Sequence, residues 1–102
     1  MRVLVESRPR FPIPQEQFPA LLEAFAGWRE RYRPIMEAFW FFSDGAGGGG
    51  IVVAPDDEAL AQMFLEYPFG PFSEVRLTPI ADGDGMIARW REALRQMGAG
   101  QG

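Results

Sequence analysis

Two glutamates lie in stretches of the sequence that are otherwise apolar, and they are the first candidates for chemistry. Glu6 follows an apolar run at positions 3–5, and Glu37 precedes another at positions 38–42. A carboxyl group in an apolar cavity has a raised pKa and can carry a proton near neutral pH. We therefore take Glu6 and Glu37 as candidate catalytic residues for a 1,3-proton shift beside a carbonyl. The alternative is that each lies at a sheet edge or pairs with an arginine in a structural ion pair.

Arginines and tyrosines are the candidates for steadying negative charge. Guanidinium groups bind carboxylates or enolates through two parallel hydrogen bonds, so Arg8 and Arg33 are candidate substrate-binding residues, with surface solvation as the alternative. Arg76 alternates with apolar neighbours, which favours the outer face of an edge strand. Tyr32 and Tyr67 fall at the ends of predicted helices, where a phenol can donate into a cavity. We expect Tyr32 to act in catalysis and Tyr67 in substrate binding.

The aromatic residues are numerous enough to line a pocket for a flat ligand. They make up 14% of the chain, and ligand pockets are lined mainly by apolar and aromatic side chains. Trp40 and Phe72 join Tyr67 as candidate substrate-binding residues. Aromatic residues at helical spacing more often belong to the core, and we expect that role for Trp28 and Phe64.

Several residue types are missing, and their absence excludes whole classes of site. The chain has no histidine, no cysteine and no lysine. A Ser-His-Asp triad, a Schiff-base lysine and a histidine- or cysteine-ligated metal are therefore excluded. Acid–base chemistry must use Asp, Glu, Tyr or a bound group, and we expect no cofactor.

The net charge and the length of the apolar runs argue against two classes of partner, nucleic acids and membranes. The net charge of −4 argues against nucleic acid, because phosphate binding needs a basic surface. The longest apolar run, at positions 38–42, is too short to span a bilayer, so no membrane partner is expected. A cysteine-free chain fits a cytoplasmic protein. The expected partners are further copies of the chain and a small hydrophobic ligand.

Hydrophobic periodicity predicts the elements that must position these groups. A chain of 102 residues is one domain, expected over positions 1–97, with a flexible tail at 98–102. Predicted strands cover positions 2–7, 35–42, 51–54 and 74–78. Predicted helices run from Pro14 to about Arg33, from Pro55 to Tyr67 and, after a capping segment at 82–85, from about Met86 to Met97. Gly47–Gly50 lacks the Lys-Ser/Thr of a phosphate loop and fits a hairpin.

The order of elements predicts the fold. Strand–helix–strand–strand–helix–strand is the ferredoxin-like pattern of α+β proteins, here with an extra C-terminal helix. Two helices would cover one face of the sheet, and the strand at 35–42, apolar on both faces, is expected to be covered on both sides. The second sheet face also needs a cover, so a dimer that packs sheet on sheet is expected. An RNA-recognition module shares this order but is excluded, because the third strand has no stacking aromatics.

Positions 40–80, roughly two-fifths of the chain, resemble the muconolactone delta-isomerase-like family. The matching residues are Trp40, Ile51, Asp57, Leu60, Pro68, Pro71, Phe72, Glu74 and the run Thr78-Pro79-Ile80. The resemblance implies a dimeric α+β barrel. It also implies a cofactor-independent enzyme with isomerase, cyclase or monooxygenase-like chemistry on a small hydrophobic or aromatic carbonyl compound. The family's isomerases carry histidine and lysine near the site, which this chain lacks. The alternative is a non-catalytic ligand-binding or oligomeric accessory protein of the same fold.

Overall fold

The computed structural model describes residues 1–101, with side chains described for residues 1–98. Its elements follow the predicted order. They are β1 (Arg2–Pro9), α1 (Phe18–Tyr32), β2 (Met36–Phe41), β3 (Gly48–Val53), α2 (Asp57–Leu65), β4 (Ser73–Pro79) and α3 (Gly83–Gln101). Short 3₁₀ turns precede α1, β2 and β4, at Gln15–Gln17, Arg33–Ile35 and Gly70–Phe72.

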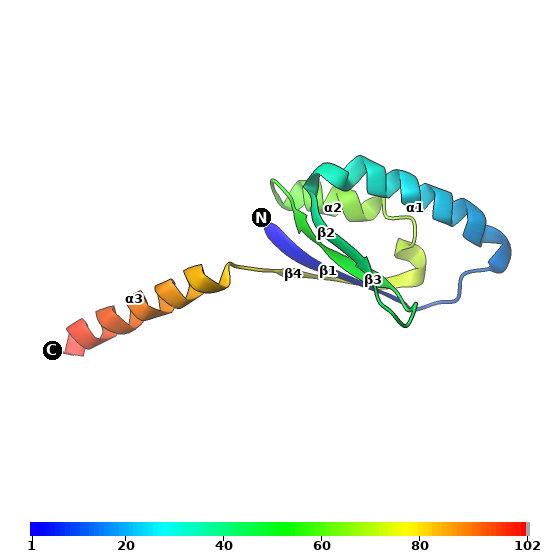
Figure 1. The fold of residues 1–102 in the computed structure, drawn as a ribbon. Coiled ribbons are helices and arrows are strands. Elements are labelled where there is room, and N and C mark those ends of the chain that lie inside the picture. Colours follow the sequence, from blue (N-terminus) through cyan, green and yellow to red (C-terminus); the bar gives the residue numbers. More distant parts are fainter. Residues whose placement is uncertain (102) are drawn as a thin grey trace.

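The four strands form one antiparallel sheet in the order β2-β3-β1-β4. Figure 1 shows α1 and α2 lying side by side over one face of this sheet, while the other face is open. The predicted ferredoxin-like α+β fold is therefore confirmed. β2 and β4 are the two edge strands, which agrees with the edge position expected for Arg76.

Strand register decides which side chains face the helices. Val3 lies opposite Val52, and Val5 lies opposite Gly50. Val3 and Val52 are almost fully buried, so odd positions of β1 face the helices. Because side chains alternate along a strand, Leu4, Glu6 and Arg8 point to the open face.

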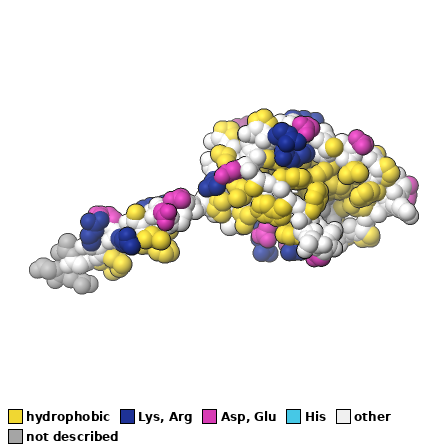
Figure 2. Space-filling model, in the orientation of Figure 1, with side chains coloured by type: hydrophobic (Ala, Val, Ile, Leu, Met, Phe, Trp, Pro, Cys, Tyr) yellow, Lys and Arg dark blue, Asp and Glu magenta, His cyan; other side chains and the backbone are white. Residues whose placement is uncertain are grey.

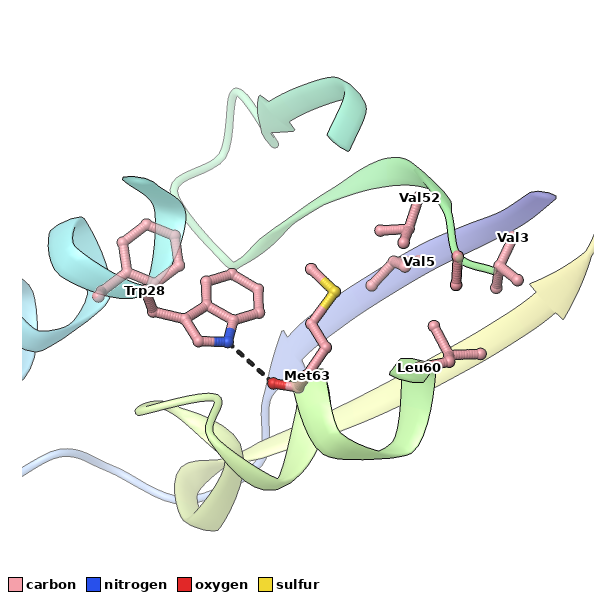
Figure 3. Packing of buried hydrophobic residues seen from close by; sticks show 8 residues of the cluster. Val3, Val5, Trp28, Val52, Leu60 and Met63 are labelled. Carbon is pink, nitrogen blue, oxygen red and sulfur yellow. Dashed lines mark hydrogen bonds between the residues drawn. The ribbon is translucent and has the colours of Figure 1, made fainter. Parts of the chain in front are cut away.

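The core forms where the two helices meet the sheet. Phe25 and Trp28 of α1 and Leu60 and Met63 of α2 pack against Val3, Val5, Val52 and Ala54. The Trp28 indole Nε1 donates a 2.9 Å hydrogen bond to the carbonyl oxygen of Met63, as Figure 3 shows. This bond ties α1 to α2 and satisfies one of the carbonyls left unpaired at a helix C-terminus.

Local chemistry sets the helix ends. α1 begins at Phe18 rather than at Pro14, because Pro14 precedes a short 3₁₀ turn, and it ends at Tyr32, two residues before Pro34. α2 begins at Asp57, because the carboxylate of Asp56 accepts a 2.8 Å hydrogen bond from the backbone N–H of Ala59. Such a cap satisfies one of the free N–H groups of the first turn.

Helix α3 stands apart from the rest of the molecule. Figure 1 shows it leading away from the end of β4, and the described chain is 70 Å long but only 26 Å by 20 Å across. α3 continues to Gln101, so positions 98–101, expected to form a flexible tail, are helical here; Gly102 lies outside the described residues. No helix in the described part of the chain is long and apolar enough to cross a membrane.

Candidate functional site: a cavity between the helices and the sheet

A cavity of about 330 Å³ lies between the helices and the helical face of the sheet. That size falls in the usual range of small-molecule sites. β1 contributes Val5, Ser7 and Pro9, and α1 contributes Phe18, Leu22, Phe25 and Trp28. β2, β3, α2 and the segment between α2 and β4 complete the wall, with Phe39, Phe41, Gly48, Gly50, Met63, Tyr67 and Phe69 among their residues.

Glycines in β3 leave the space that the cavity occupies. A Cβ at Gly50 would stand 2.5 Å from the carbonyl oxygen of Ala38, and one at Gly48 would collide with the carbonyl oxygen of Trp40. No side chain fits at either position, so this end of the sheet carries no side chains from β3. The predicted hairpin is also present: Gly47 has a φ of +99°, a conformation that favours glycine.

A small cluster of hydroxyl groups supplies the polarity of the cavity. The Tyr67 hydroxyl lies 2.8 Å from Oγ of Ser7, and it also bonds to Ser73. Burial raises the pKa of Tyr67, and the hydrogen bonds to Ser7 and Ser73 partly oppose this effect. At neutral pH the phenol is therefore protonated and can donate a hydrogen bond to a ligand oxygen.

No charged side chain lines this cavity within the described residues. An ionised group without a partner is costly to bury, so the cavity suits an uncharged or charge-dispersed ring system. Any ionised group on a ligand would have to stay near the opening. The chemistry available inside is hydrogen-bond donation from the Tyr67 phenol and the serine hydroxyls.

Aromatic rings form much of the wall, with Phe25 at their centre. Its ring centroid lies 5.3 Å from that of Phe69 and 6.0 Å from that of Phe39. These are the separations at which aromatic pairs attract one another. The Arg29 guanidinium lies 4.8 Å from the centroid of the Phe39 ring, and its Nη1 is buried without a hydrogen-bond partner among the described residues. The walls are thus flat rings, which match a flat ligand.

The two glutamates expected to move protons lie outside this cavity. Glu37 makes hydrogen bonds of 2.8 Å and 2.5 Å with Arg2, and both side chains are 44% exposed. This is the structural ion pair that the sequence left open as an alternative. Glu6 lies on the open face, where it lines a separate hollow of about 110 Å³ with Arg8, Glu74 and Arg76.

Strand register accounts for that second hollow. Glu6 lies opposite Arg76, and Arg8 lies opposite Glu74. Opposite charges facing each other across two strands stabilise a sheet. The Arg8 guanidinium also lies 4.3 Å from the centroid of the Phe42 ring. Glu6 and Arg8 therefore lie on the open face, away from the cavity.

Tyr32 and Arg33 also make contacts away from the cavity. The Tyr32 hydroxyl donates a hydrogen bond to Glu66, and this bond is the main reason that the pKa of Tyr32 is raised. Arg33 pairs with Glu30 at 2.5 Å in an exposed ion pair. Neither residue lines the cavity.

Of the three aromatic residues expected to contact a ligand, two line the cavity and one does not. Tyr67 lines the cavity through its hydroxyl and ring. Trp40 borders it, but the residue lies opposite Gly49, and a Cβ there would be 3.1 Å from the indole Nε1. Gly49 lies opposite Glu6, so the indole covers the open face. Phe72 does not line the cavity; its carbonyl oxygen accepts hydrogen bonds of 2.8 Å and 3.0 Å from the N–H groups after β1.

The two serines and Phe25 were not among the site residues predicted from the sequence. A signal for Ser7 was present, because it continues the alternation of Val3 and Val5 and is therefore a hydroxyl on the buried face of β1. Ser73 and Tyr67 come close to it only through the turn after α2. That contact depends on tertiary structure, which local patterns do not specify.

Comparison with known proteins supports the fold assignment. No protein-family model matches the chain, and the search of curated proteins gives no match either. Among solved structures, a muconolactone isomerase is similar, with a TM-score of 0.71 and 14% identity over 80% of this chain and 90% of that one. A 5-chloro-2-hydroxyhydroquinone dehydrochlorinase from Burkholderia phenoliruptrix, solved with 2,5-dihydroxybenzoquinone, has a TM-score of 0.68 and 13% identity over 83% and 98%. The chain therefore has a muconolactone isomerase-like fold.

Proposed function

We propose that this protein is a cofactor-independent enzyme that binds a small, flat, hydrophobic or aromatic carbonyl compound and assists proton transfer on it. The observation that carries the proposal is the Tyr67 hydroxyl, held 2.8 Å from Ser7 in a cavity with no charged lining. Isomerase, cyclase or monooxygenase-like chemistry would each use such a donor.

In the proposed reaction Tyr67 donates a hydrogen bond to the carbonyl oxygen of the ligand. A 1,3-proton shift removes a proton from one carbon and delivers another two atoms away, with an enol or enolate between. A donor fixed before the reaction and shielded from water stabilises the charge that develops on that oxygen. Ser7 and Ser73 hold the phenol in place. The carbon-bound proton passes to an oxygen of the ligand itself or to water at the opening of the cavity.

The two similar structures fit this substrate class. One is an enzyme named for a lactone, and the other was solved with a dihydroxybenzoquinone, a flat ring with oxygens at its edge. Flat oxygenated rings of this size would suit a cavity of about 330 Å³ walled by Phe25, Phe39 and Phe69. The likeness supports the type of ligand, and the hydroxyl cluster of this chain supports the role of Tyr67.

A second candidate function is ligand binding without catalysis. The cavity lining contains no carboxylate within the described residues, and the glutamates Glu6 and Glu37 lie outside it. A protein that only carries a flat ligand would need the aromatic wall and one hydrogen-bond donor, and no base. The two candidates therefore differ in whether protons of the bound ligand exchange.

The proposal also includes self-association in the cytoplasm. The open sheet face carries Leu4, Ile51 and the indole of Trp40 between its charged residues, and a second sheet packed there would remove them from water. A homodimer or larger homo-oligomer is the assembly that this face favours.

Exchange of ligand protons with D₂O tests the proposal. Flat quinones, lactones and phenols are first screened by thermal shift, and the ligands that stabilise the protein are then followed by NMR in D₂O. With the wild-type protein we expect deuterium to be incorporated at a carbon of the ligand. With Tyr67→Phe the rate of incorporation should fall at least about tenfold. Tyr32→Phe removes the other phenol, outside the cavity, and should leave the rate unchanged.

The outcomes separate the two candidates. Binding without any deuterium uptake would leave only the carrier role. Equal rates for wild type and Tyr67→Phe would contradict the role of the phenol, and no stabilising ligand among these classes would contradict the substrate class.

A further inference from the structure

The opening of the cavity is rimmed by large apolar side chains that no part of their own chain covers. Phe18 and Leu22 of α1 and Phe39 and Phe41 of β2 all line the cavity, yet each is between 37% and 65% exposed. We call these four residues the mouth patch. Figure 2 shows a band of hydrophobic surface across the body of the molecule. Contiguous exposed apolar surface in a small protein marks a contact site.

Helix α3 carries a second uncovered apolar surface. Ile87, Trp90, Leu94 and Met97 are spaced by three, four and three residues, so they lie on one side of the helix. Each is between 45% and 66% exposed. We call them the α3 stripe. A helix that projects from the body with such a stripe exposed lacks the burial that normally stabilises it.

The two surfaces lie at opposite ends of the molecule. The N–H of Ile80 donates to the carbonyl oxygen of Arg2 at 2.9 Å, so α3 departs where β1 begins. The mouth patch lies near the other end of β1, because Phe41 is opposite Gly48 and Gly48 is opposite Ser7. Figure 1 shows α3 pointing away from that end. A helix of 19 residues is about 28 Å long, enough to cover the opening on another molecule.

We propose that α3 of a second copy of this chain docks its stripe on the mouth patch and closes the cavity, with Trp90 at the entrance. Charge supports a second copy as the occupant. Residues 1–80 carry eleven acidic and seven basic residues, a net charge of −4, whereas α3 carries three arginines against Asp84 and Glu92, a net charge of +1. Opposite charges favour the correct docking partner.

The charges also lie beside the apolar residues concerned. Arg89 and Arg91 flank Trp90 in the sequence, while Glu23 follows Leu22 and Asp44 stands three residues after Phe41. Arg29, whose guanidinium lies against the Phe39 ring, is a basic residue at the same patch. In a two-fold dimer the exchange is reciprocal, so each cavity would be completed by the other subunit. The inference concerns access to the cavity that carries the proposed function. It holds equally if the cavity only binds its ligand.

Disulfide cross-linking tests this docking directly, because the native chain has no cysteine. Leu22→Cys is made in one copy and Leu94→Cys in a copy with a different tag, and the two are mixed and oxidised. We expect a covalent heterodimer on a non-reducing gel. Ala88→Cys, on the opposite side of α3, replaces Leu94→Cys as the matched control and should cross-link far less. The same result is expected in a Tyr67→Phe background, which separates this test from that of the proposed reaction.

Assembly strength gives a second measurement. Trp90→Glu should raise the dissociation constant of the assembly at least about tenfold by analytical ultracentrifugation, and Ala88→Glu should leave it unchanged. Equal effects of the two variants would overturn the proposal. A second pair of results would also overturn the proposal: a chain that carries both cysteines forms an internal disulfide, and the mixed single-cysteine copies form no heterodimer. In that case α3 docks on its own chain.

Discussion

The Tyr67 hydroxyl lies 2.8 Å from Oγ of Ser7, and this contact joins the first strand to the turn after α2 across 60 positions of sequence. Ser7 is only 8% exposed. A hydroxyl in an apolar cavity is costly to bury without a partner, so each of the two groups satisfies the other. The contact also fixes the direction of the phenol toward the cavity.

The first prediction concerns the ionisation of the two phenols of the chain. The pKa of Tyr67 is raised mainly by burial, and that of Tyr32 mainly by its hydrogen bond to Glu66. We therefore expect both to ionise above pH 10 in an ultraviolet absorbance titration. Glu66→Gln should return the pKa of Tyr32 toward 10 and leave Tyr67 raised.

The sign of the accompanying stability change follows from the same shift. Because the pKa of Tyr67 is higher in the folded state than in the unfolded chain, its contribution to stability is complete below about pH 10 and falls as the pH rises through the folded value. Tyr67→Phe removes this group, so its stability should decline less steeply in alkali than that of the wild type. Identical alkaline profiles would contradict a buried phenol.

The second prediction concerns the glycines of β3. Gly50→Ala should lower the free energy of unfolding by about 1–3 kcal/mol, because the added Cβ would stand 2.5 Å from the carbonyl oxygen of Ala38 and strand backbone cannot move aside cheaply. Gly27→Ala is the matched control in the middle of α1, where a Cβ meets no atom within 4 Å. It should raise the free energy by up to about 1 kcal/mol. Urea denaturation of both variants measures the difference, and a stable Gly50→Ala protein would refute the packing argument.

The third prediction concerns the bond between the two packed helices. Trp28→Phe removes the donor that satisfies the buried carbonyl oxygen of Met63. Leaving a buried acceptor unpaired costs about 1–3 kcal/mol, before the loss of ring volume is added. A conservative change at an exposed aromatic residue outside every proposed contact, Phe11→Leu, should change the free energy of unfolding by less than about 0.5 kcal/mol. Equal losses at the two positions would mean that the bond contributes nothing measurable.

The sequence predicted the fold well because local patterns and the fold agree. The run from Phe18 to Tyr32 has helical spacing, the alternation of Val3, Val5 and Ser7 has strand spacing, and prolines mark the ends. Local rules therefore specify the order of elements. The place of Tyr67 at the end of a helix led to the expectation that it reaches a cavity, and its side chain lines the cavity between the helices and the sheet; its role in binding a ligand stays a prediction.

The site was harder to predict because side-chain partners depend on register. The apolar neighbours of Glu6 in the sequence favoured a place in a cavity, but alternation along β1 turns its side chain to the open face, opposite Arg76. The strand that carries Phe39 and Phe41 was expected to be covered on both of its faces. β2 is instead an edge strand, and both rings remain exposed. Which strand lies at an edge is a property of the whole sheet and cannot be derived from the strand's own residues.

The last prediction concerns acid stability at the end of α2. The pKa of Glu66 lies below its ordinary value of 4.5, first because of the hydrogen bond from Tyr32 and then because of that from Gln62. A carboxyl group with a lowered folded-state pKa adds stability above its unfolded pKa, and that stability disappears as the pH falls through the folded value. Tyr32→Phe should therefore make stability less sensitive to acid below about pH 4.5, and should raise the pKa of Glu66 measured by carbon NMR. The side chain is one-third exposed, so added salt should weaken the contribution of its ion pair with Arg31. If the carboxyl group of Glu66 titrates at the same pH in both proteins, the hydrogen bond from Tyr32 is not the cause of the shift.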